Sequence, residues 1–238
     1  MRGLIVAGSP EPSSKELLAR LHEEADYTIA ADRGAALLHA AKIVPDLFCG
    51  DEDSIGPETR AWVASARFPE ERFPWKKDDT DLGLAFRFAE LEATRREEPL
   101  DLVVTCASGG RADHALGVFG VLAEHAGKIV SAGGSLALEE DAFLCRILPA
   151  GSSWQLGPRA QHHTFSALSL AERSRITEVG MLWSVEHSDL GLLDDRGVSN
   201  RIESGDAAIL CEEGMVAAFL LKDAHEGEHA GERQELGA

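Results

Sequence analysis

The chain has 238 residues, which is enough for one large domain or two smaller ones that each bury a core. Its acidic residues outnumber its basic ones by 41 to 23, and the formal net charge is -18. A surface with this charge repels the phosphates of nucleic acids and of anionic lipids, which argues against a protein that binds nucleic acid or a membrane surface.

Secretion and membrane insertion are not expected either. The N-terminal apolar run ends before Pro10, and no stretch reaches the roughly 18 apolar residues that span a bilayer. The four cysteines lie far apart without the spacing of metal ligands, so we expect them to be buried free thiols. These features predict a cytoplasmic protein.

The first half of the chain alternates short apolar runs with helical patterns. The runs are typical of buried parallel strands and comprise residues 4–7, 27–31, 47–49 and 102–106. Helices are expected to begin at a capping box formed by Ser13 and Glu16, after Asp32, at Pro57, at Asp81 and at Ala112. The last helix is expected to end at Glu124, before a short strand at 129–130. The alternation predicts an α/β fold whose parallel sheet is covered by helices on both faces.

The second half changes character near Gly133-Gly134. Strand-like runs separated by Gly, Pro and Asp turns follow at 142–148, 154–156, 164–170, 181–185, 207–211 and 215–221. They predict a small all-β domain, either a sandwich or a barrel. We therefore expect an α/β domain over 1–134, this all-β domain over 135–222 and, because the last stretch is polar and glycine-rich, a flexible tail over 223–238.

A first acidic segment follows the predicted strand at 47–49. Asp51 and Asp53 are two residues apart at the end of a strand, so their side chains project to the same side, and Gly50 permits a close approach there. Two like charges held this close are readily tolerated when a hard cation such as Mg²⁺ neutralises them. The alternative is a solvated acidic turn.

A second acidic segment, Lys77-Asp78-Asp79-Thr80-Asp81, opens a predicted helix. Capping and the helix dipole explain one aspartate at a helix start. Three acidic residues in four positions beside Lys76 and Lys77 exceed what capping requires. They indicate a further Mg²⁺ ligand and a lysine that contacts phosphate.

The segment from Ser108 to His114 joins a predicted strand to a helix. Gly109 and Gly110 let the backbone come close to a ligand, the helix start offers N–H groups to phosphate, and Arg111 can clamp phosphate oxygens. The alternative is a plain turn, but the nearby Arg, Asp and His favour nucleotide binding. Because the chain contains neither GxxxxGK[ST] nor a GxGxxG fingerprint after the first strand, these loops must build the phosphate site themselves.

Six blocks occur in the order in which a known family has them: Ala31-Asp32-Arg33-Gly34-Ala35, Pro45 to Ile55, Lys77 to Asp81, Gly109 to His114, Gly180-Met181-Leu182-Trp183, and Val198-Ser199-Asn200. With them the chain resembles the thiamine pyrophosphokinase family over roughly residues 1–221. The family usually has Gly at the position of Arg33 and Asn at that of Ala36. Arg33 would either add a phosphate contact or fill space that a small residue leaves open.

The resemblance implies a Rossmann-like α/β catalytic domain that binds ATP and Mg²⁺, followed by a C-terminal β-sandwich that binds thiamine. It implies a homodimer whose active sites lie between the catalytic domain of one subunit and the β domain of the other. The reaction would move a diphosphate from ATP to the thiamine hydroxyl, giving thiamine diphosphate and AMP.

The resemblance also implies residue roles. The Mg²⁺ ligands would be Asp51, Asp53 and Asp81, with Asp32 as a further catalytic residue. Among these carboxylates we favour Asp81 as the acceptor of the hydroxyl proton. The ATP side would comprise Lys77, Asp78, Gly109, Gly110, Arg111, Asp113 and His114. The thiamine side would comprise Trp183, Ser199 and Asn200. Trp183 would stack on the thiazolium cation, the alternative being a core aromatic of the β domain.

Two other functions remain open on the sequence. An enzyme of the same fold could act on another hydroxymethyl acceptor, such as a pterin, while keeping the ATP and metal motifs. A relative without catalysis could bind thiamine or nucleotide, a reading that only the departures at Arg33 and Ala36 support.

Overall fold

The computed structural model describes residues 1–50, 55–66, 70–72 and 80–222. Asp51, Asp53, Lys77, Asp78 and the expected tail at 223–238 lie outside these ranges. The first part of the chain alternates strands and helices: β1 (Arg2–Val6), α1 (Lys15–Glu23), β2 (Tyr27–Ala31), α2 (Gly34–Ala41), β3 (Leu47–Gly50), α3 (Pro57–Ala66), β4 (Glu70–Arg72), α4 (Asp81–Arg96), β5 (Asp101–Thr105) and α5 (Ala112–Ser131).

The second part consists mainly of strands: β6 (Ser135–Glu140), β7 (Phe143–Pro149), β8 (Ser152–Gln155), β9 (Thr164–Ser169), β10 (Arg173–Val179), β11 (Val185–Gly191), β12 (Asn200–Arg201), β13 (Ala208–Glu213) and β14 (Met215–Leu221). Single 3-10 turns lie at Pro158–Ala160 and Asp195–Gly197. Among the helices described, none combines the length and the apolar character of a membrane span.

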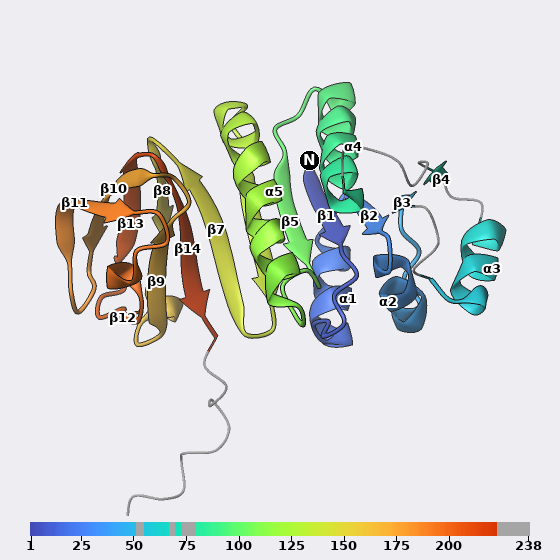
Figure 1. The fold of residues 1–238 in the computed structure, drawn as a ribbon, viewed down its shortest axis with the longest axis horizontal. Helices are drawn as coiled ribbons and strands as arrows, with labels where there is room; N and C mark the ends of the chain where they lie inside the picture. Colours follow the sequence, from blue (N-terminus) through green and yellow to red (C-terminus); the bar gives the residue numbers. More distant parts are fainter. Residues whose placement is uncertain (51–54, 67–69, 73–79, 223–238) are drawn as a thin grey trace, which may run out of the picture.

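One large mixed sheet runs through most of the molecule (Figure 1). Its strand order is β12-β9-β14-β7-β6-β5-β1-β2-β3-β4, and neighbouring strands from β6 to β4 in this order are parallel. The pairs from β6 to β12 are antiparallel. A second, antiparallel sheet has the order β11-β10-β13-β8. The division expected after residue 134 stays a prediction, and the large sheet is continuous across that point because β6 pairs with both β5 and β7.

Helices cover both faces of the parallel part of the sheet. Alternate residues of a strand face opposite sides, so β1 contributes to two cores. Leu4 packs in a cluster with Leu17 and Leu38 of α1 and α2. Ile5 belongs to the opposite cluster, which contains residues of α4 and α5 such as Leu122. The fully buried run at 4–6 is therefore explained by two helical layers.

The antiparallel part of the large sheet is covered differently. Val216 and Ala218 of β14 face the second sheet in a cluster that includes Phe165 and Ile209, whereas Ala217 faces the helical core. Figure 1 shows the two sheets layered at the C-terminal end of the molecule, with α5 beside β7. The expected two-sheet arrangement of the second half is present in this form.

Two local predictions are wrong. The strand expected at 129–130 is the last turn of α5, because Leu122, Ala126 and Ile129 continue the helical spacing and are all buried. The strand expected at 181–185 is instead a turn, in which Ser184 Oγ donates to Met181 O at 3.0 Å and β11 starts only at Val185.

The cap of α1 lies one residue later than expected. Ser14 is the N-cap, and its hydroxyl accepts from Leu17 N at 3.2 Å. The Ser13 hydroxyl is bonded elsewhere, since it accepts from Asp141 N at 3.1 Å and donates to Glu140. The four cysteines are buried free thiols, as expected.

Candidate active site

The loops that follow β1 and β2 lie directly against each other. A Cβ added to Gly8 would come within 2.4 Å of Arg33 Cβ, and one added to Gly34 within 1.9 Å of Val6 O. Only glycine fits at these two positions. Arg33 is the N-cap residue of α2 and is exposed. This arginine, which stands where the family usually has glycine, therefore lies on the surface where the two loops meet. In an open α/β sheet, ligands bind at this carboxyl edge of the strands.

Asp32 and Asp81 meet the end of β3 at the same edge. Asp32 N donates to Cys49 O at 2.8 Å, and a Cβ on Gly50 would lie 3.3 Å from Asp32 Cα. Cys49 Sγ donates to Asp81 O at 3.7 Å. Asp32 has a left-handed φ of 51° and Asp81 is the first residue of α4, after the N-cap Thr80. Both Asp32 and Asp81 therefore contact Cys49 through their backbone, at the end of β3.

The predicted metal ligands are only partly described. Asp51 and Asp53 lie outside the described residues, as do Lys77 and Asp78 of the ATP set. Within the described ranges, no group of three or more His, Cys, Asp or Glu is arranged to hold a metal. Carboxylates at one sheet edge fit a hard cation such as Mg²⁺.

The glycine pair of the predicted ATP loop packs on the loop after β1. A Cβ on Gly109 would lie 2.2 Å from Glu11 O, and one on Gly110, whose φ is 83°, would lie 2.3 Å from Pro10 Cγ. Ser9 Oγ donates to Gly109 O at 2.9 Å. These glycines are thus required by the protein's own packing, whereas the sequence suggested only the approach of a ligand.

The next residues form the start of α5. Arg111 binds the Asp113 carboxylate through Nε at 3.1 Å and through its terminal nitrogen at 2.5 Å. The Arg111 guanidinium lowers the pKa of Asp113 to about 2. Both side chains and His114 are exposed, and Arg111, the N-cap residue, makes no side-chain capping bond to the helix. The first N–H groups of α5 are therefore not covered by a capping side chain.

Glu140 is a residue of this loop region to which the sequence analysis assigned no role. It lies at the end of β6, is buried, and accepts hydrogen bonds from the backbone N–H groups of Cys106, Ala107 and Ser108 at 3.0, 2.9 and 3.1 Å. The available signal was an acidic pair, Glu139-Glu140, that ends an otherwise apolar strand pattern. An acidic residue at the end of a strand does not by itself predict which hydrogen-bond donors its carboxylate binds.

The three predicted thiamine-side residues lie together in the β region. Asn200 Oδ1 accepts from Trp183 N at 3.1 Å, and its Nδ2 donates to Trp183 O at 3.0 Å. Ser199 has a φ of 65°, and its N–H donates to Ser166 Oγ at 3.0 Å. The Trp183 side chain is 62% exposed, which contradicts the alternative of a core aromatic.

Asn200 itself is buried and bonded inside the protein. Besides Trp183, it donates to Glu178 Oε2 at 2.9 Å and accepts from Arg201 N at 2.9 Å. Burial raises the pKa of Glu178 to about 7, although the Asn200 hydrogen bond acts in the opposite direction. The Asn200 side chain therefore supports the turn that carries Trp183, and it is the indole that faces solvent.

The thiamine side and the carboxylate edge are far apart within one chain. Asn200 lies on β12, and Asp32 follows β2, seven strand spacings away in the large sheet. At about 4.8 Å per spacing, this separation is roughly 30–35 Å along the sheet. One chain does not bring the two predicted halves of the site together.

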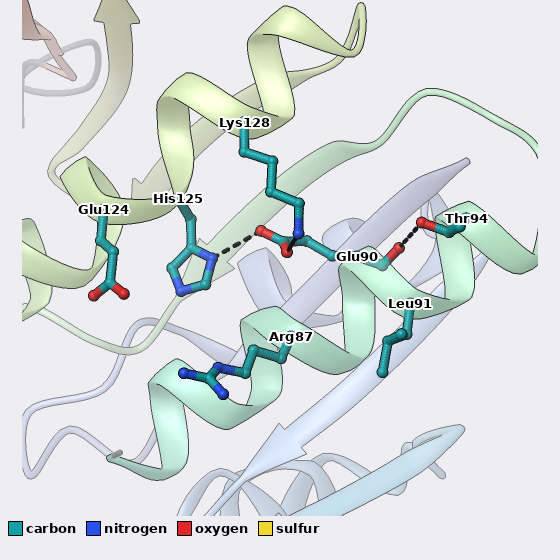
Figure 2. Close-up of a pocket in the computed structure, with 7 residues that line it drawn as sticks. All are labelled: Arg87, Glu90, Leu91, Thr94, Glu124, His125 and Lys128. Atoms are coloured by element: carbon teal, nitrogen blue, oxygen red, sulfur yellow. Dashed lines mark hydrogen bonds and ion pairs between the residues drawn. The ribbon is translucent and has the colours of Figure 1, made fainter. Parts of the chain in front are cut away.

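A separate groove of about 470 Å³ lies between α4 and α5 (Figure 2). Its polar lining comprises Arg87, Glu90, Thr94, Glu124, His125 and Lys128. Glu90 pairs with Lys128 and lies 2.7 Å from His125 Nδ1. Both helices begin at the carboxyl edge of the sheet, and these residues lie further along them, so the groove is not the predicted site.

The sequence matches a known catalytic domain. Residues 18–131 match the model of the family described as thiamin pyrophosphokinase, catalytic domain. The thiamine pyrophosphokinase of Bacillus subtilis (strain 168) is 35% identical over 113 residues, which are 48% of this chain and 50% of that protein. The alignment thus spans about half the length of this curated relative.

The fold is similar to solved structures over nearly the whole chain. The crystal structure of thiamine pyrophosphokinase from Bacillus subtilis has a TM-score of 0.76 and 22% identity, covering 94% of this chain and 100% of that one. Thiamin pyrophosphokinase from Candida albicans has a TM-score of 0.78 and 15% identity, covering 93% and 90%. These likenesses confirm a mixed α/β fold with a large mixed sheet and a second antiparallel sheet. Residues 18–131 are thus similar to the catalytic domain of thiamin pyrophosphokinases, and the fold is similar to theirs over nearly the whole chain.

Proposed function

We propose that the protein transfers a diphosphate group from ATP to the hydroxyl of thiamine, giving thiamine diphosphate and AMP. The observation that carries this proposal is that Asp32 and Asp81 both contact Cys49 at the end of β3, on one edge of the sheet. This edge lies within the segment that matches the catalytic domain. The relatives are named for this activity, and the proposal extends it to the present chain.

We further propose that Asp51, Asp53 and Asp81 hold Mg²⁺, with Asp32 beside them. The carboxylate oxygens of this set match the ligands that Mg²⁺ prefers. When bound, the ion supplies charge neutralisation for the triphosphate. The proposal places the metal at the edge where β2, β3 and the start of α4 meet.

The chain's residues act by positioning and by charge. In the proposed step the thiamine oxygen forms a bond to the β-phosphorus of ATP, while the bond from that phosphorus to the α,β-bridging oxygen breaks. AMP leaves with the bridging oxygen, and the hydroxyl proton passes to a carboxylate, for which Asp81 is the candidate. Arg111 and Lys77 bind phosphate oxygens of ATP. Transfer of this kind depends mainly on alignment and electrostatic stabilisation.

The β region supplies the thiamine side. Trp183 presents an exposed indole, which binds organic cations well, on a turn held by Asn200, with Ser199 adjacent. We assign ATP and Mg²⁺ binding to residues 1–134 and thiamine binding to residues 135–222. Because the two halves lie roughly 30–35 Å apart along the sheet, the complete site requires a second copy of the chain.

A homodimer is therefore part of the proposal. Exposed apolar side chains gather in the segment that contains Trp183: Val179, Leu182, Leu192, Leu193 and Val198. Concentrated apolar exposure of this kind is typical of an interaction surface. In the dimer, the carboxylate edge of one subunit would face the Trp183 turn of the other. The free thiols fit a reducing compartment, and we propose the cytoplasm as the location.

The test is AMP release by the purified full chain with ATP, Mg²⁺ and thiamine. We expect turnover that stops when EDTA is added and returns with excess Mg²⁺. A parallel assay replaces thiamine with a hydroxymethyl pterin, and turnover with the pterin alone would favour the same-fold enzyme. Thiamine binding measured by calorimetry without AMP release would favour the non-catalytic relative.

A further inference from the structure

Glu140 is a buried carboxylate whose two oxygens are both occupied by donors from the loops at the carboxyl edge. Oε1 accepts from the N–H groups of Ala107 and Ser108 at 2.9 and 3.1 Å, and from Ser108 Oγ at 3.1 Å. Oε2 accepts from Cys106 N at 3.0 Å and from Ser13 Oγ at 2.5 Å. A buried charge is costly unless such donors compensate it.

The backbone geometry of the loop agrees with this arrangement. Cys106 ends the run of β5 with a left-handed φ of 55°, which is unfavourable for a residue other than glycine. This conformation turns consecutive N–H groups towards one point, as in the concave backbone sites that bind anions. Here the anion is the protein's own Glu140. The N–H groups of residues 106–108 are therefore already used and are not the groups that receive a phosphate.

The same end of β6 also fixes the loop after β1. Ser13 binds Glu140, and Asp141 accepts from Ser14 N at 2.6 Å and from Ser14 Oγ at 2.7 Å. Gly109 packs against this loop at Glu11, and Ser9 N donates to Cys106 O at 2.9 Å. The Glu140 carboxylate thus connects the loop after β1 to the loop after β5, which contains Gly109 and Gly110.

We propose that Glu140 is a positioning residue for the ATP-side loop. Its carboxylate holds residues 106–108 in place, so that Gly109 and the start of α5 present their N–H groups and Arg111 to the phosphates of a nucleotide. The Gly110 N–H is not part of this set, because it donates to Glu11 Oε2 at 3.3 Å. This inference rests on the proposed function for the identity of the ligand. It confines the phosphate contacts of this loop to residue 109 and those after it.

The test compares Glu140→Gln with Glu139→Gln. Glutamine replaces one acceptor oxygen by an NH₂ group. Because both Oε1 and Oε2 of Glu140 accept from donors, the NH₂ group meets donors at either position and leaves them without an acceptor. Glu139 is a matched control because it is also buried on β6 but accepts from Arg20 and Lys222 instead. For each variant, KM for ATP and kcat are measured separately, and hydrogen exchange is followed in the peptide that covers residues 106–110.

For Glu140→Gln we expect KM for ATP to rise roughly 10-fold or more, since misplacement of a binding loop by about 1 Å is costly. We expect kcat to fall less, and the exchange of the 106–110 amides to accelerate. Glu139→Gln should keep KM within about 2-fold of the wild type. Equal KM values and equal exchange in the two variants would overturn the positioning role.

The outcome separates this inference from the proposed function. If the wild type releases no AMP with thiamine, the proposed function fails, while amide exchange still tests whether Glu140 holds the loop. If Glu140→Gln does not fold, Ser108→Ala and Ser13→Ala each remove a single donor to Glu140 and keep the carboxylate. Each should then raise KM for ATP by about 2- to 5-fold, in line with the loss of one hydrogen bond, and no rise in either would contradict the inference.

Discussion

Asn200 of β12 donates a hydrogen bond to Glu178 Oε2 of β10 at 2.9 Å, and so joins the large sheet to the second sheet. Glu178 is only 4% exposed, and within the described part of the chain its Oε1 has no hydrogen-bond partner. Burial raises the pKa of this carboxyl group to about 7. The group that supports Asn200, and through it the Trp183 turn, is therefore titratable near neutral pH.

The first prediction concerns the pH dependence of stability in Glu178→Gln. The pKa of Glu178 is about 7 in the folded protein against 4.5 for the ordinary group. The folded state thus binds this proton more tightly, and ionisation opposes folding. The wild type should lose stability relative to Glu178→Gln as the pH rises from about 4.5 to about 7, by on the order of 3 kcal/mol, and the difference should then level off.

Urea unfolding between pH 5 and pH 8 measures this difference. The exposed Glu186→Gln on β11 is the control, and its difference from the wild type should not follow the same pH course. A constant difference for Glu178→Gln across this range would contradict the raised pKa.

The second prediction concerns the affinity for thiamine. Trp183→Leu should weaken thiamine binding by about 5- to 30-fold, which corresponds to the loss of a cation–π contact worth about 1–2 kcal/mol. The melting temperature should change little because the indole is exposed. Calorimetric titration measures the affinity, and Leu91→Ala, another exposed apolar residue, is the control. Unchanged affinity in Trp183→Leu would remove the indole from the site.

The third prediction concerns the carboxylate edge. Asp81→Asn should lower kcat/KM for AMP release by about 10²- to 10³-fold, by analogy with the loss of one preorganised charge-stabilising group. Glu58→Gln is a matched control because Glu58 is likewise an acidic residue in the first turn of a helix, α3. Both changes weaken the interaction with the helix dipole, but only Asp81 contacts the end of β3, through Cys49. Near-normal turnover in Asp81→Asn would show that the metal assignment is wrong.

The fourth prediction tests whether the site is shared between subunits. Asp81→Asn and Trp183→Leu are each assayed alone at low thiamine and then after mixing under conditions that exchange subunits. A mixed dimer has one site with both native residues, so random exchange should restore about a quarter of the native sites. No recovery on mixing, with exchange verified by tagged subunits, would place both residues in one chain's site.

The order of strands and helices in the first half follows from the sequence because its signals are local. Apolar runs and breakers mark β1, β2, β3 and β5, and the carboxyl edge then follows from parallel pairing. The structure places Asp32 and Asp81 at the end of β3 and Gly109 against the loop after β1, and their roles in a site stay predictions.

The contacts that support the site could not be predicted in this way. Ser13 and Glu140 are separated by 127 positions in the chain, and Trp183 and Asn200 by 17. No periodic pattern specifies which donor a buried acid meets. The extent of α5 could not be predicted for a related reason, since Ile129 and Val130 favour strands locally but lie in a helix, from which Ile129 packs in the core.

The fifth prediction compares Gly109, which precedes α5, with Gly120, which lies inside it. A Cβ on Gly109 would lie 2.2 Å from the backbone oxygen of Glu11, so Gly109→Ala must push the ATP-side loop away from the loop after β1. We expect lower stability and a KM for ATP raised by about 10-fold or more. Gly120 lies inside the helix, and no atom is within 4 Å of the position that its Cβ would take.

Gly120→Ala should therefore stabilise the protein by about 0.5–1 kcal/mol, because alanine restricts the unfolded chain and favours helix without meeting any obstacle. Its kinetics should remain those of the wild type. Thermal unfolding and steady-state assays of the two variants make the comparison. If Gly109→Ala were as stable and as active as Gly120→Ala, the loop after β5 would not be packed against the loop after β1 at Gly109.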